Sequence, residues 1–381
     1  MKHRKFGSLD WESSILGFGM ANLPISKDVP NLPDATTSIE MIRHAIDRGV
    51  NFLDMGYPFD SERQDHTAGI VSAALKNGYR DRVKIAATLP AHCIHSSGDF
   101  DLMLDRQLSR LHIDRLDFCL LGRLNRENWP VLRDRGALIW AEHTIKSGRI
   151  GSIGFSFHDH FQILRSILAA FSRWALCQMQ FSYMDSAHDP GIGGIKYAAQ
   201  NGLAVVVTES LRGGRLVRKI PETVASVMGI NLNQRQLTGY ALRFVWSFPE
   251  VSTVVRSMNS ISELEETVAI ADSAESDSLT IQEELLIGKL RDAYRKLMRI
   301  PCTSCRTCMP CPEEIDVPRI FEIYNDAFIY EDPATARSIY RNEHHRLHQC
   351  SRCGDCQKRC VKQLDVIEWL GRAHRMLCGS T

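Results

Sequence analysis

Eight short apolar runs alternate with amphipathic segments between residues 14 and 255, and this alternation constrains the fold more than any other feature. The runs are rich in aliphatic and β-branched residues, as is typical of strands buried on both faces. Eight strand–helix units in series predict an α/β fold, a parallel (β/α)8 TIM barrel, rather than an antiparallel sandwich. The runs are residues 14–20, 51–54, 83–88, 116–121, 152–155, 175–181, 203–207 and 251–255.

The composition turns polar around residues 271–283, and we place a domain boundary there. A barrel is predicted over residues 1–280 and a small α-helical domain over residues 281–381. Apart from the strand–helix alternation, no internal repeat is evident. Helices of the second domain are expected from Ile281 to about Ile300, over Pro318–Phe328 and over Pro333–Asn342.

Charge and hydropathy exclude several classes of protein. The net charge of the 381 residues is +1, which gives no electrostatic reason to expect nucleic acid or an anionic membrane as a partner. No run of about 18 apolar residues is present, so we expect no membrane span. The basic residues near Met1 precede no apolar stretch, so we expect no secretory signal and a cytoplasmic location.

Nine of the twelve cysteines lie after residue 300, and eight of these form two runs. Clustered C-x-x-C spacing without a secretory signal indicates metal or cluster binding rather than disulfides. Cys378 belongs to neither run and is predicted to be a free thiol. The runs are Cys302, Cys305, Cys308 and Cys311, followed by Cys350, Cys353, Cys356 and Cys360.

This spacing predicts two [4Fe–4S] clusters, because three thiolates at intervals of three surround one cluster and the fourth usually ligates the other. The alternatives are two zinc sites, since Zn²⁺ also takes four thiolates, or clusters with a purely structural role. Zinc ribbons normally pair knuckles from separate strands, and two adjacent clusters favour electron transfer. One predicted cluster takes Cys302, Cys305, Cys308 and Cys360, and the other takes Cys350, Cys353, Cys356 and Cys311.

Several short motifs, in order along nearly the whole chain, resemble those of aldo-keto reductases fused to a C-terminal ferredoxin-like domain. Each motif is common by itself, and their order and spacing together carry the resemblance. They are Leu16-Gly-Phe-Gly-Met20, Asn51-Phe-Leu-Asp54, Ile153-Gly-Phe-Ser-Phe-His158, Gln178-Met-Gln-Phe-Ser-Tyr183, Glu209-Ser-Leu-Arg-Gly-Gly214 and Pro301-Cys-Thr-Ser-Cys305.

The resemblance implies a catalytic tetrad of Asp, Tyr, Lys and His, in which Tyr protonates a carbonyl while NADPH supplies hydride. Only the Asp is present, as Asp54, whereas the other positions read Phe59, Thr88 and Gly122. Phe59 has no proton to donate, and general acid catalysis is typically worth about 10²–10⁴-fold. Asp54 is then expected to pair with another cation, to carry a raised pKa through burial, or to be structural.

Nucleotide-binding positions implied by the resemblance are also altered. The glycine of the phosphate loop reads Ser257, and the asparagine that closes the segment reads Thr267. Arg256 can still meet a phosphate of NADP(H) and Gln180 a nicotinamide amide, or both are scaffold residues without that use.

Other side chains near the predicted barrel mouth offer replacement acid–base groups. We take Tyr57 and His158 as the candidates, because Tyr57 shares the loop of the lost tyrosine and histidine titrates near neutral pH. Further polar residues after the strands are His92, His95 and Arg123.

Three functions remain open. The favoured one is an iron–sulfur oxidoreductase that transfers electrons to or from a small-molecule substrate or an electron-transfer protein. The second is a non-catalytic electron-transfer subunit of a partner oxidoreductase. The third is an NADPH-dependent carbonyl reductase with a replaced proton donor.

Overall fold

The computed structural model describes residues 1–29, 31–56, 61–186, 190–218, 220–226, 233–274, 279–343, 345 and 347–378. Their contacts divide the chain into two compact units, which are described separately. The first unit comprises Met1–Gly213 and Thr238–Thr280, and the second comprises Gly214–Leu237 and Ile281–Thr381. Residues 214–237 lie within the first domain predicted from the sequence but group with the second unit.

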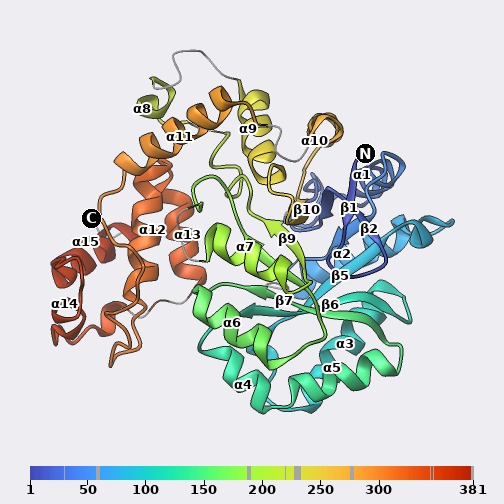
Figure 1. The fold of residues 1–381 in the computed structure, drawn as a ribbon, viewed down its shortest axis with the longest axis horizontal. Helices are drawn as coiled ribbons and strands as arrows, with labels where there is room; N and C mark the ends of the chain where they lie inside the picture. The colour runs from blue at the N-terminus through green and yellow to red at the C-terminus, as the bar shows by residue number, and fades with distance from the viewer. Residues whose placement is uncertain are drawn as a thin grey trace. The chain divides into compact units, whose positions relative to one another are not determined.

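Eight parallel strands close into a barrel in the first unit (Figure 1), which confirms the predicted fold class. Each apolar run of the sequence forms one strand, consecutive strands are neighbours, and the last pairs with the first. The strands are β3 (Leu16–Gly19), β4 (Phe52–Asp54), β5 (Lys84–Leu89), β6 (Leu116–Leu124), β7 (Ile150–Phe157), β8 (Trp174–Gln180), β9 (Ala204–Thr208) and β10 (Val251–Arg256).

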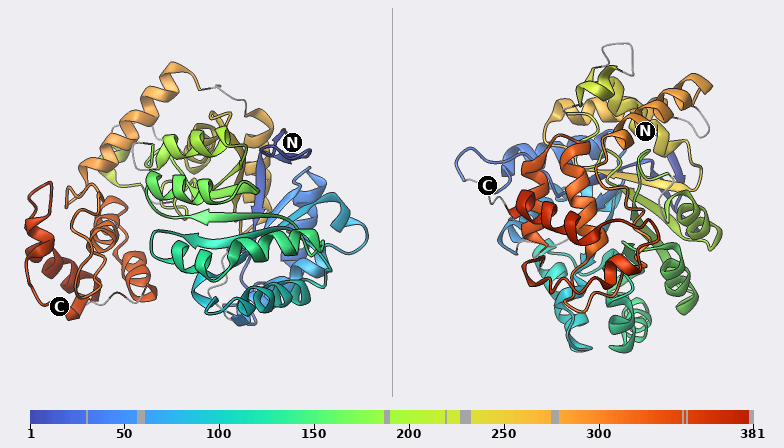
Figure 2. Two further views of the ribbon diagram at one scale, coloured as in Figure 1. Left: turned by 60° about the horizontal axis from the view of Figure 1, so that its bottom comes forward. Right: turned by 90° about the vertical axis from the view of Figure 1, so that its left-hand side faces the viewer.

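Helices follow the strands and cover the outside of the barrel (Figure 2). Their buried faces repeat at the three- and four-residue spacing that the sequence predicts, as in α1, where Met41, Ile42 and Ala45 are buried. They are α1 (Ala35–Asp47), α2 (Ser61–Ala74), α3 (Gly98–Leu111), α4 (Asn128–Asp134), α5 (Ala137–Lys146), α6 (Phe161–Ala170), α7 (Gly191–Gln200), α9 (Gln234–Trp246) and α10 (Ile261–Ser273).

Side chains alternate between the inside of the barrel and the surrounding helices. On β6, Phe118 and Leu120 belong to the interior cluster, whereas Cys119 and Leu121 belong to the core between strands and helices. A hairpin of β1 (His3–Lys5) and β2 (Glu12–Ser14) leads through Phe6, whose ring centre lies 4.9 Å from that of Phe118. Aromatic packing therefore fills the barrel near the starts of its strands.

The second unit is helical, as predicted. The expected helices over 318–328 and 333–342 correspond to α12 and α13, while the expected helix from Ile281 ends at Lys296 rather than Ile300. Asp316 and Asp332 cap α12 and α13 by accepting hydrogen bonds from backbone N–H groups one turn on. The helices are α8 (Glu222–Ala225), α11 (Ile281–Lys296), α12 (Val317–Ile329), α13 (Pro333–Asn342), α14 (Asp355–Lys358) and α15 (Val366–Cys378).

Helices α12, α13 and α15 pack on one another around a core that includes Phe321, Tyr340 and Leu370. Across the described parts of both units, no helix is both long enough and apolar enough to cross a bilayer.

Candidate functional site

Asp54 ends β4 inside the barrel and is held by a residue from the opposite wall. Gln178 of β8, four strands away around the barrel, donates a 2.8 Å hydrogen bond from Nε2 to Asp54 Oδ2. The backbone N–H of Gly56 donates to Asp54 Oδ1 at 3.0 Å. Asp54 and Gln178 are only 4% and 8% exposed, so the bond spans a closed interior.

Among the residues that the structure describes, the hydrogen-bond donors to this carboxyl group are Gly56 and Gln178, and neither is a lysine. Thr88, at the position where the family resemblance implies lysine, is buried on the neighbouring strand β5. Burial raises the pKa of Asp54, and the hydrogen bonds from Gly56 and Gln178 oppose that shift only in part. Asp54 is therefore paired with a neutral amide, and its pKa lies above the usual value of an aspartate.

The described residues among the other acid–base candidates are exposed, unlike Asp54. Tyr57 and Phe59 lie outside the described residues. His158 follows β7, is exposed, and its backbone N–H donates to Leu124 O at 3.1 Å. His92 and His95, after β5, are exposed as well.

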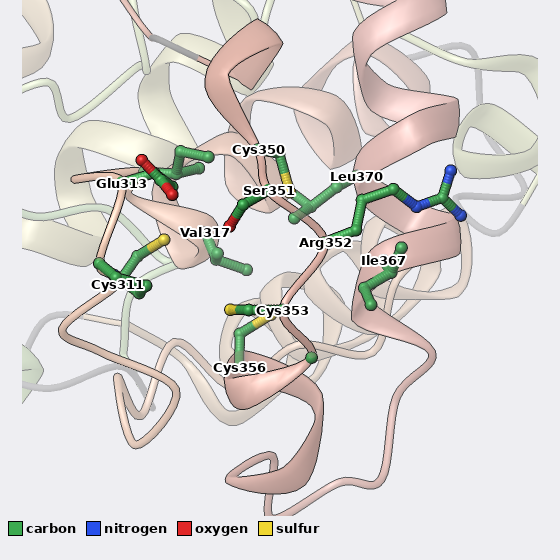
Figure 3. A pocket seen from close by; sticks show the side chains of 13 residues that line it. Cys311, Glu313, Val317, Cys350, Ser351, Arg352, Cys353, Cys356, Ile367 and Leu370 are labelled. Carbon is green, nitrogen blue, oxygen red and sulfur yellow. The ribbon is translucent and has the colours of Figure 1, made fainter.

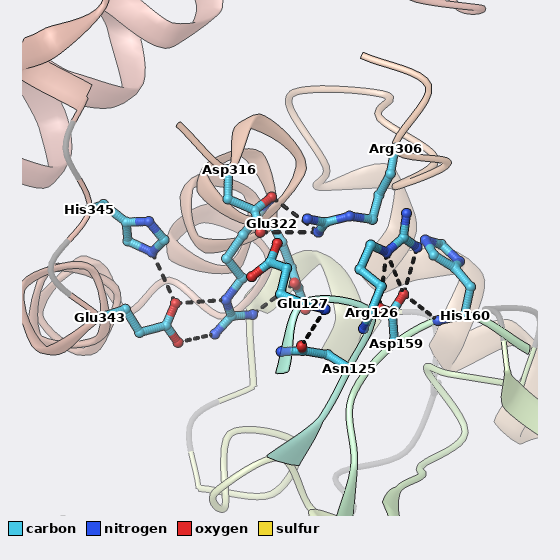
Figure 4. A network of polar contacts seen from close by, with 11 residues as sticks. Asn125, Arg126, Glu127, Asp159, His160, Arg306, Asp316, Glu322, Glu343 and His345 are labelled. Atoms are coloured by element: carbon cyan, nitrogen blue, oxygen red, sulfur yellow. Dashed lines mark hydrogen bonds and ion pairs between the residues drawn. The ribbon is translucent and has the colours of Figure 1, made fainter. Parts of the chain in front are cut away.

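An ion pair joins two loops that follow neighbouring strands at the carboxyl end of the barrel. Arg126 Nη2 lies 2.6 Å from Asp159 Oδ1, and Arg126 Nε lies 3.0 Å from Asp159 Oδ2 (Figure 4). Burial acts to raise the pKa of Asp159, but the hydrogen bonds from Arg126 and from the backbone N–H of His160, together with the charge of Arg126, lower that pKa. Asp159 is therefore an ionised structural partner, and sequence reasoning did not single it out.

Arg256, the candidate phosphate ligand, already has protein partners. Its guanidinium is 2.6 Å from Glu263 Oε1 and also donates to the hydroxyl of Thr267. The residue is 8% exposed, so a phosphate would have to compete with the carboxylate of Glu263. Gln180, the candidate nicotinamide ligand, is the exposed last residue of β8.

Four cysteines from both runs line one cavity in the second unit. The cavity opens to solvent, and its other lining residues include Val317 and Leu370 (Figure 3). One of the cysteines comes from the first run and three come from the second. They are Cys311, Cys350, Cys353 and Cys356.

The pKa shifts of the thiols distinguish these four cysteines from a second group. Burial raises the pKa of Cys356, and its charged neighbours that add to the shift are Cys311, Cys350 and Cys353. Burial also raises the pKa of Cys302, with Cys305 and Cys360 adding to it.

Cys308 links the groups. Burial, then the nearby Cys302, Cys305 and Cys356, raise its pKa to about 12. The thiols thus form two adjacent sets, each drawing one member from the other run. As thiolates, the members of each set would repel one another unless cations compensate them.

The two cysteine runs share a backbone conformation, which corrects the expectation of no further repeat. In both, the residues before and after the second cysteine have positive φ: 53° and 57° for Ser304 and Arg306, 55° and 81° for Arg352 and Gly354. The match extends past the fourth cysteine.

Glu314 and Gln363, each three residues after that cysteine, have φ of 55° and 52° and donate from N–H to its carbonyl at 3.0 Å. Asp316 and Asp365 then cap the following helices. In the sequence, the repeat of the two runs is visible as an Asp-Val pair that begins five residues after the fourth cysteine of each run, at 316–317 and 365–366.

Two arginines fix the runs in place. Arg359 donates from its guanidinium to the carbonyls of Met309 and Pro310 at 3.2 and 3.3 Å, joining the second run to the first. Arg306 Nη1 lies 3.0 Å from Asp316 Oδ2, so the first loop is tied to the start of α12 (Figure 4).

Six of the eight cysteines pack against the core of the second unit, while Cys305 and Cys353 are exposed. The N–H of Ser304 donates to Cys302 Sγ at 3.4 Å, and a hydrogen bond with Thr307, 3.2 Å away, lowers the pKa of Cys305. Among the described residues, no three His, Cys, Asp or Glu side chains converge on a point where they would bind a single metal ion.

Comparison with known proteins agrees with the barrel. The sequence family described as the Aldo/keto reductase family matches residues 15–282. An aldo-keto reductase from Bacillus halodurans superposes with a TM-score of 0.60 at 22% identity, over 76% of this chain and 96% of that one.

An aldo-keto reductase from Klebsiella pneumoniae, solved in complex with NADPH, gives a TM-score of 0.58 at 16% identity, over 76% and 96% of the two chains. At these identities the structural likeness establishes the fold alone.

Proposed function

This chain belongs to the aldo/keto reductase family, and from that premise we propose that it is an iron–sulfur oxidoreductase. The eight cysteines of the second unit would bind two [4Fe–4S] clusters, which would supply one-electron transfer to or from a substrate or a protein partner. The observation that carries the proposal is the interleaved sorting of the thiols, three from one run and one from the other in each set.

The donor set fits such a group. Soft thiolates are the ligands that iron–sulfur clusters require, and each set offers four. A single Zn²⁺ would need four sulfurs at about 2.3 Å from one point, which implies close mutual contact. Four of the thiols instead line a cavity, which favours a larger group with its own inorganic sulfides over a lone ion.

Protein groups around the thiols serve to hold and tune them. The hydrogen bonds of Ser304 and Thr307 to sulfur, and the apolar core beneath the runs, are features that adjust the potential of a bound cluster. Arg359, which precedes Cys360, donates to the carbonyls of Met309 and Pro310, which precede Cys311, and would hold the two fourth cysteines near each other.

The barrel, in this proposal, does not run the hydride chemistry of its family. Asp54 is tied to Gln178 instead of a lysine, and Arg256 is engaged by Glu263. NADPH thus fits these residues poorly. The alternative of an NADPH-dependent carbonyl reductase remains as a second candidate, because a relative of the same fold was solved with NADPH.

Single-cysteine variants test the interleaved ligation. Cys311→Ser and Cys350→Ser should alter the same half of the electron paramagnetic resonance (EPR) spectrum, whereas Cys360→Ser and Cys302→Ser should alter the other half. Cys378→Ser is the control and should leave the spectrum unchanged. If Cys311→Ser instead matches Cys302→Ser, each run binds its own metal group and the interleaved arrangement is wrong.

A further inference from the structure

The two cysteine runs have the same backbone but opposite charge. In residues 302–314 the charged residues are Arg306, Glu313 and Glu314, a net charge of −1. In residues 350–363 four cations oppose one carboxylate, a net charge of +3. The charged residues of this second run are Arg352, Asp355, Lys358, Arg359 and Lys362.

The difference is concentrated at equivalent positions. Two residues after the fourth cysteine, the first run has Glu313 and the second has Lys362. The residue immediately after that cysteine is Pro312 in the first run and Val361 in the second, and Val361 is 63% exposed. An apolar side chain that remains in solvent beside cations is typical of an interaction surface.

The cations of the second run are accessible. Arg352, Lys358, Arg359 and Lys362 are all exposed, and the Lys358 side chain is 76% exposed. The nearest carboxylate on this run, Asp355, is 3.8 Å from Lys358 and 4.0 Å from Arg359 and offsets only one charge. Across the cavity, Glu313 is the facing acid. Figure 3 shows the guanidinium of Arg352 directed away from the cysteines.

From these observations we propose that Arg352, Lys358, Val361 and Lys362, here called the basic rim, dock an acidic one-electron carrier protein. The inference rests on the proposed function and names the partner of that site. One electron would leave the reduced carrier, which is oxidised, and the chain would be reduced by one electron. Entry would occur beside the second run, since the first run would repel an acidic partner.

The rim favours a protein over nucleic acid as the polyanion. A phosphate backbone is bound by many cations along an extended track, and the chain as a whole carries only +1. The exposed Val361, which lies between Lys358 and Lys362 in the sequence, instead suits a protein interface that combines apolar and charged side chains.

Charge reversal tests the proposal on the full-length, iron-loaded chain. The probe is a flavodoxin with an acidic isoelectric point, and the readouts are its dissociation constant by calorimetry and its electron-transfer rate by stopped flow. Lys358→Glu with Lys362→Glu should weaken binding and slow transfer by about tenfold or more at low salt. The effect should shrink at about 0.5 M salt.

Lys289→Glu with Lys296→Glu is the matched control, because both lysines are exposed on α11 and the change in charge is identical. It should alter either readout by less than about twofold. Cytochrome c, a basic carrier, should respond to the rim variant in the opposite direction.

Equal effects of the rim and control variants would overturn the docking site. So would a result in which the rim variant loses binding to a DNA duplex, measured as a second probe, while its binding to flavodoxin is unchanged. Iron content and EPR spectra are measured on every variant. Normal spectra with unchanged flavodoxin binding refute the docking proposal alone, whereas a chain that binds no iron refutes the proposed function.

Discussion

Gln178 Nε2 donates a 2.8 Å hydrogen bond across the barrel to Asp54 Oδ2, and this bond replaces the ion pair that the family resemblance implies. A lysine beside the carboxylate would lower its pKa, whereas burial beside a neutral amide raises the pKa of Asp54. The carboxyl end of β4 thus holds a buried carboxyl group whose pKa is raised.

This predicts how stability depends on pH. The folded-state pKa of Asp54 is raised above its unfolded value of 3.8, so its contribution to stability is full below that pH and is lost as the pH rises through the folded pKa. Asp54→Asn cannot titrate, and Gln178 can turn its amide to accept from the new NH₂ group. Relative to wild type, the variant should therefore gain free energy of unfolding between about pH 4.5 and pH 8. Urea unfolding at both pH values measures this, and a constant difference would contradict it.

Removal of the amide should be costly. Gln178→Leu leaves the Asp54 carboxyl buried without its cross-barrel donor, which should lower the free energy of unfolding by about 1–3 kcal/mol. Gln180→Leu is the matched control on the same strand, because Gln180 is exposed, and it should change stability by less than about 0.5 kcal/mol. Equal losses in the two variants would show that the bond contributes little.

Asp316 both caps α12 and pairs with Arg306, and a comparison with Asp332, which caps α13, separates the two roles. Asp316→Ala removes the cap of α12 and the partner of Arg306, while Asp332→Ala removes the cap of α13. Each should cost about 0.5–2 kcal/mol in denaturant unfolding. Only Asp316→Ala should speed chelator-driven release of iron, because only that residue anchors a cysteine loop. Equal release rates from the two variants would argue against the anchor.

NADPH should bind weakly, because the candidate phosphate ligand Arg256 already pairs with a carboxylate. Glu263 occupies the guanidinium of Arg256, so Glu263→Gln should increase NADPH affinity by several-fold, whereas Glu266→Gln on the same helix should not. Titration with nicotinamide fluorescence gives the affinities. Tight binding by the wild type that Arg256→Gln abolishes would instead support the NADPH-dependent reductase.

Much of the fold is predictable from the sequence because strand burial and helix amphipathicity are local patterns. All eight apolar runs form strands. Helices α12 and α13 each begin with an Asp at the N-cap and a Pro in the first turn, a local signal of a helix start. The shared backbone conformation of the cysteine runs could not be predicted from the sequence. It depends on positive φ angles at Ser304, Arg306 and Arg352, and these residue types do not indicate that conformation as glycine does.

The candidate site was harder to predict, because its contacts join residues far apart in the chain. The partner of Asp54 is 124 residues away, and no spacing rule connects β4 with β8 until the barrel closes. The ion pair between Arg256 and Glu263 joins residues that are close in the sequence, but it forms only because α10 directs Glu263 toward Arg256. The grouping of the cysteines around two clusters stays a prediction, which rests on the ligand spacing that cluster chemistry requires.

The central claim is that the cysteines hold two [4Fe–4S] clusters, and analysis of iron and acid-labile sulfide after anaerobic purification tests it most directly. The account predicts about eight iron and eight sulfide per chain, with an EPR signal from interacting clusters after reduction. Zinc without sulfide, or eight thiols that react freely with a thiol reagent in the absence of metal, would contradict it.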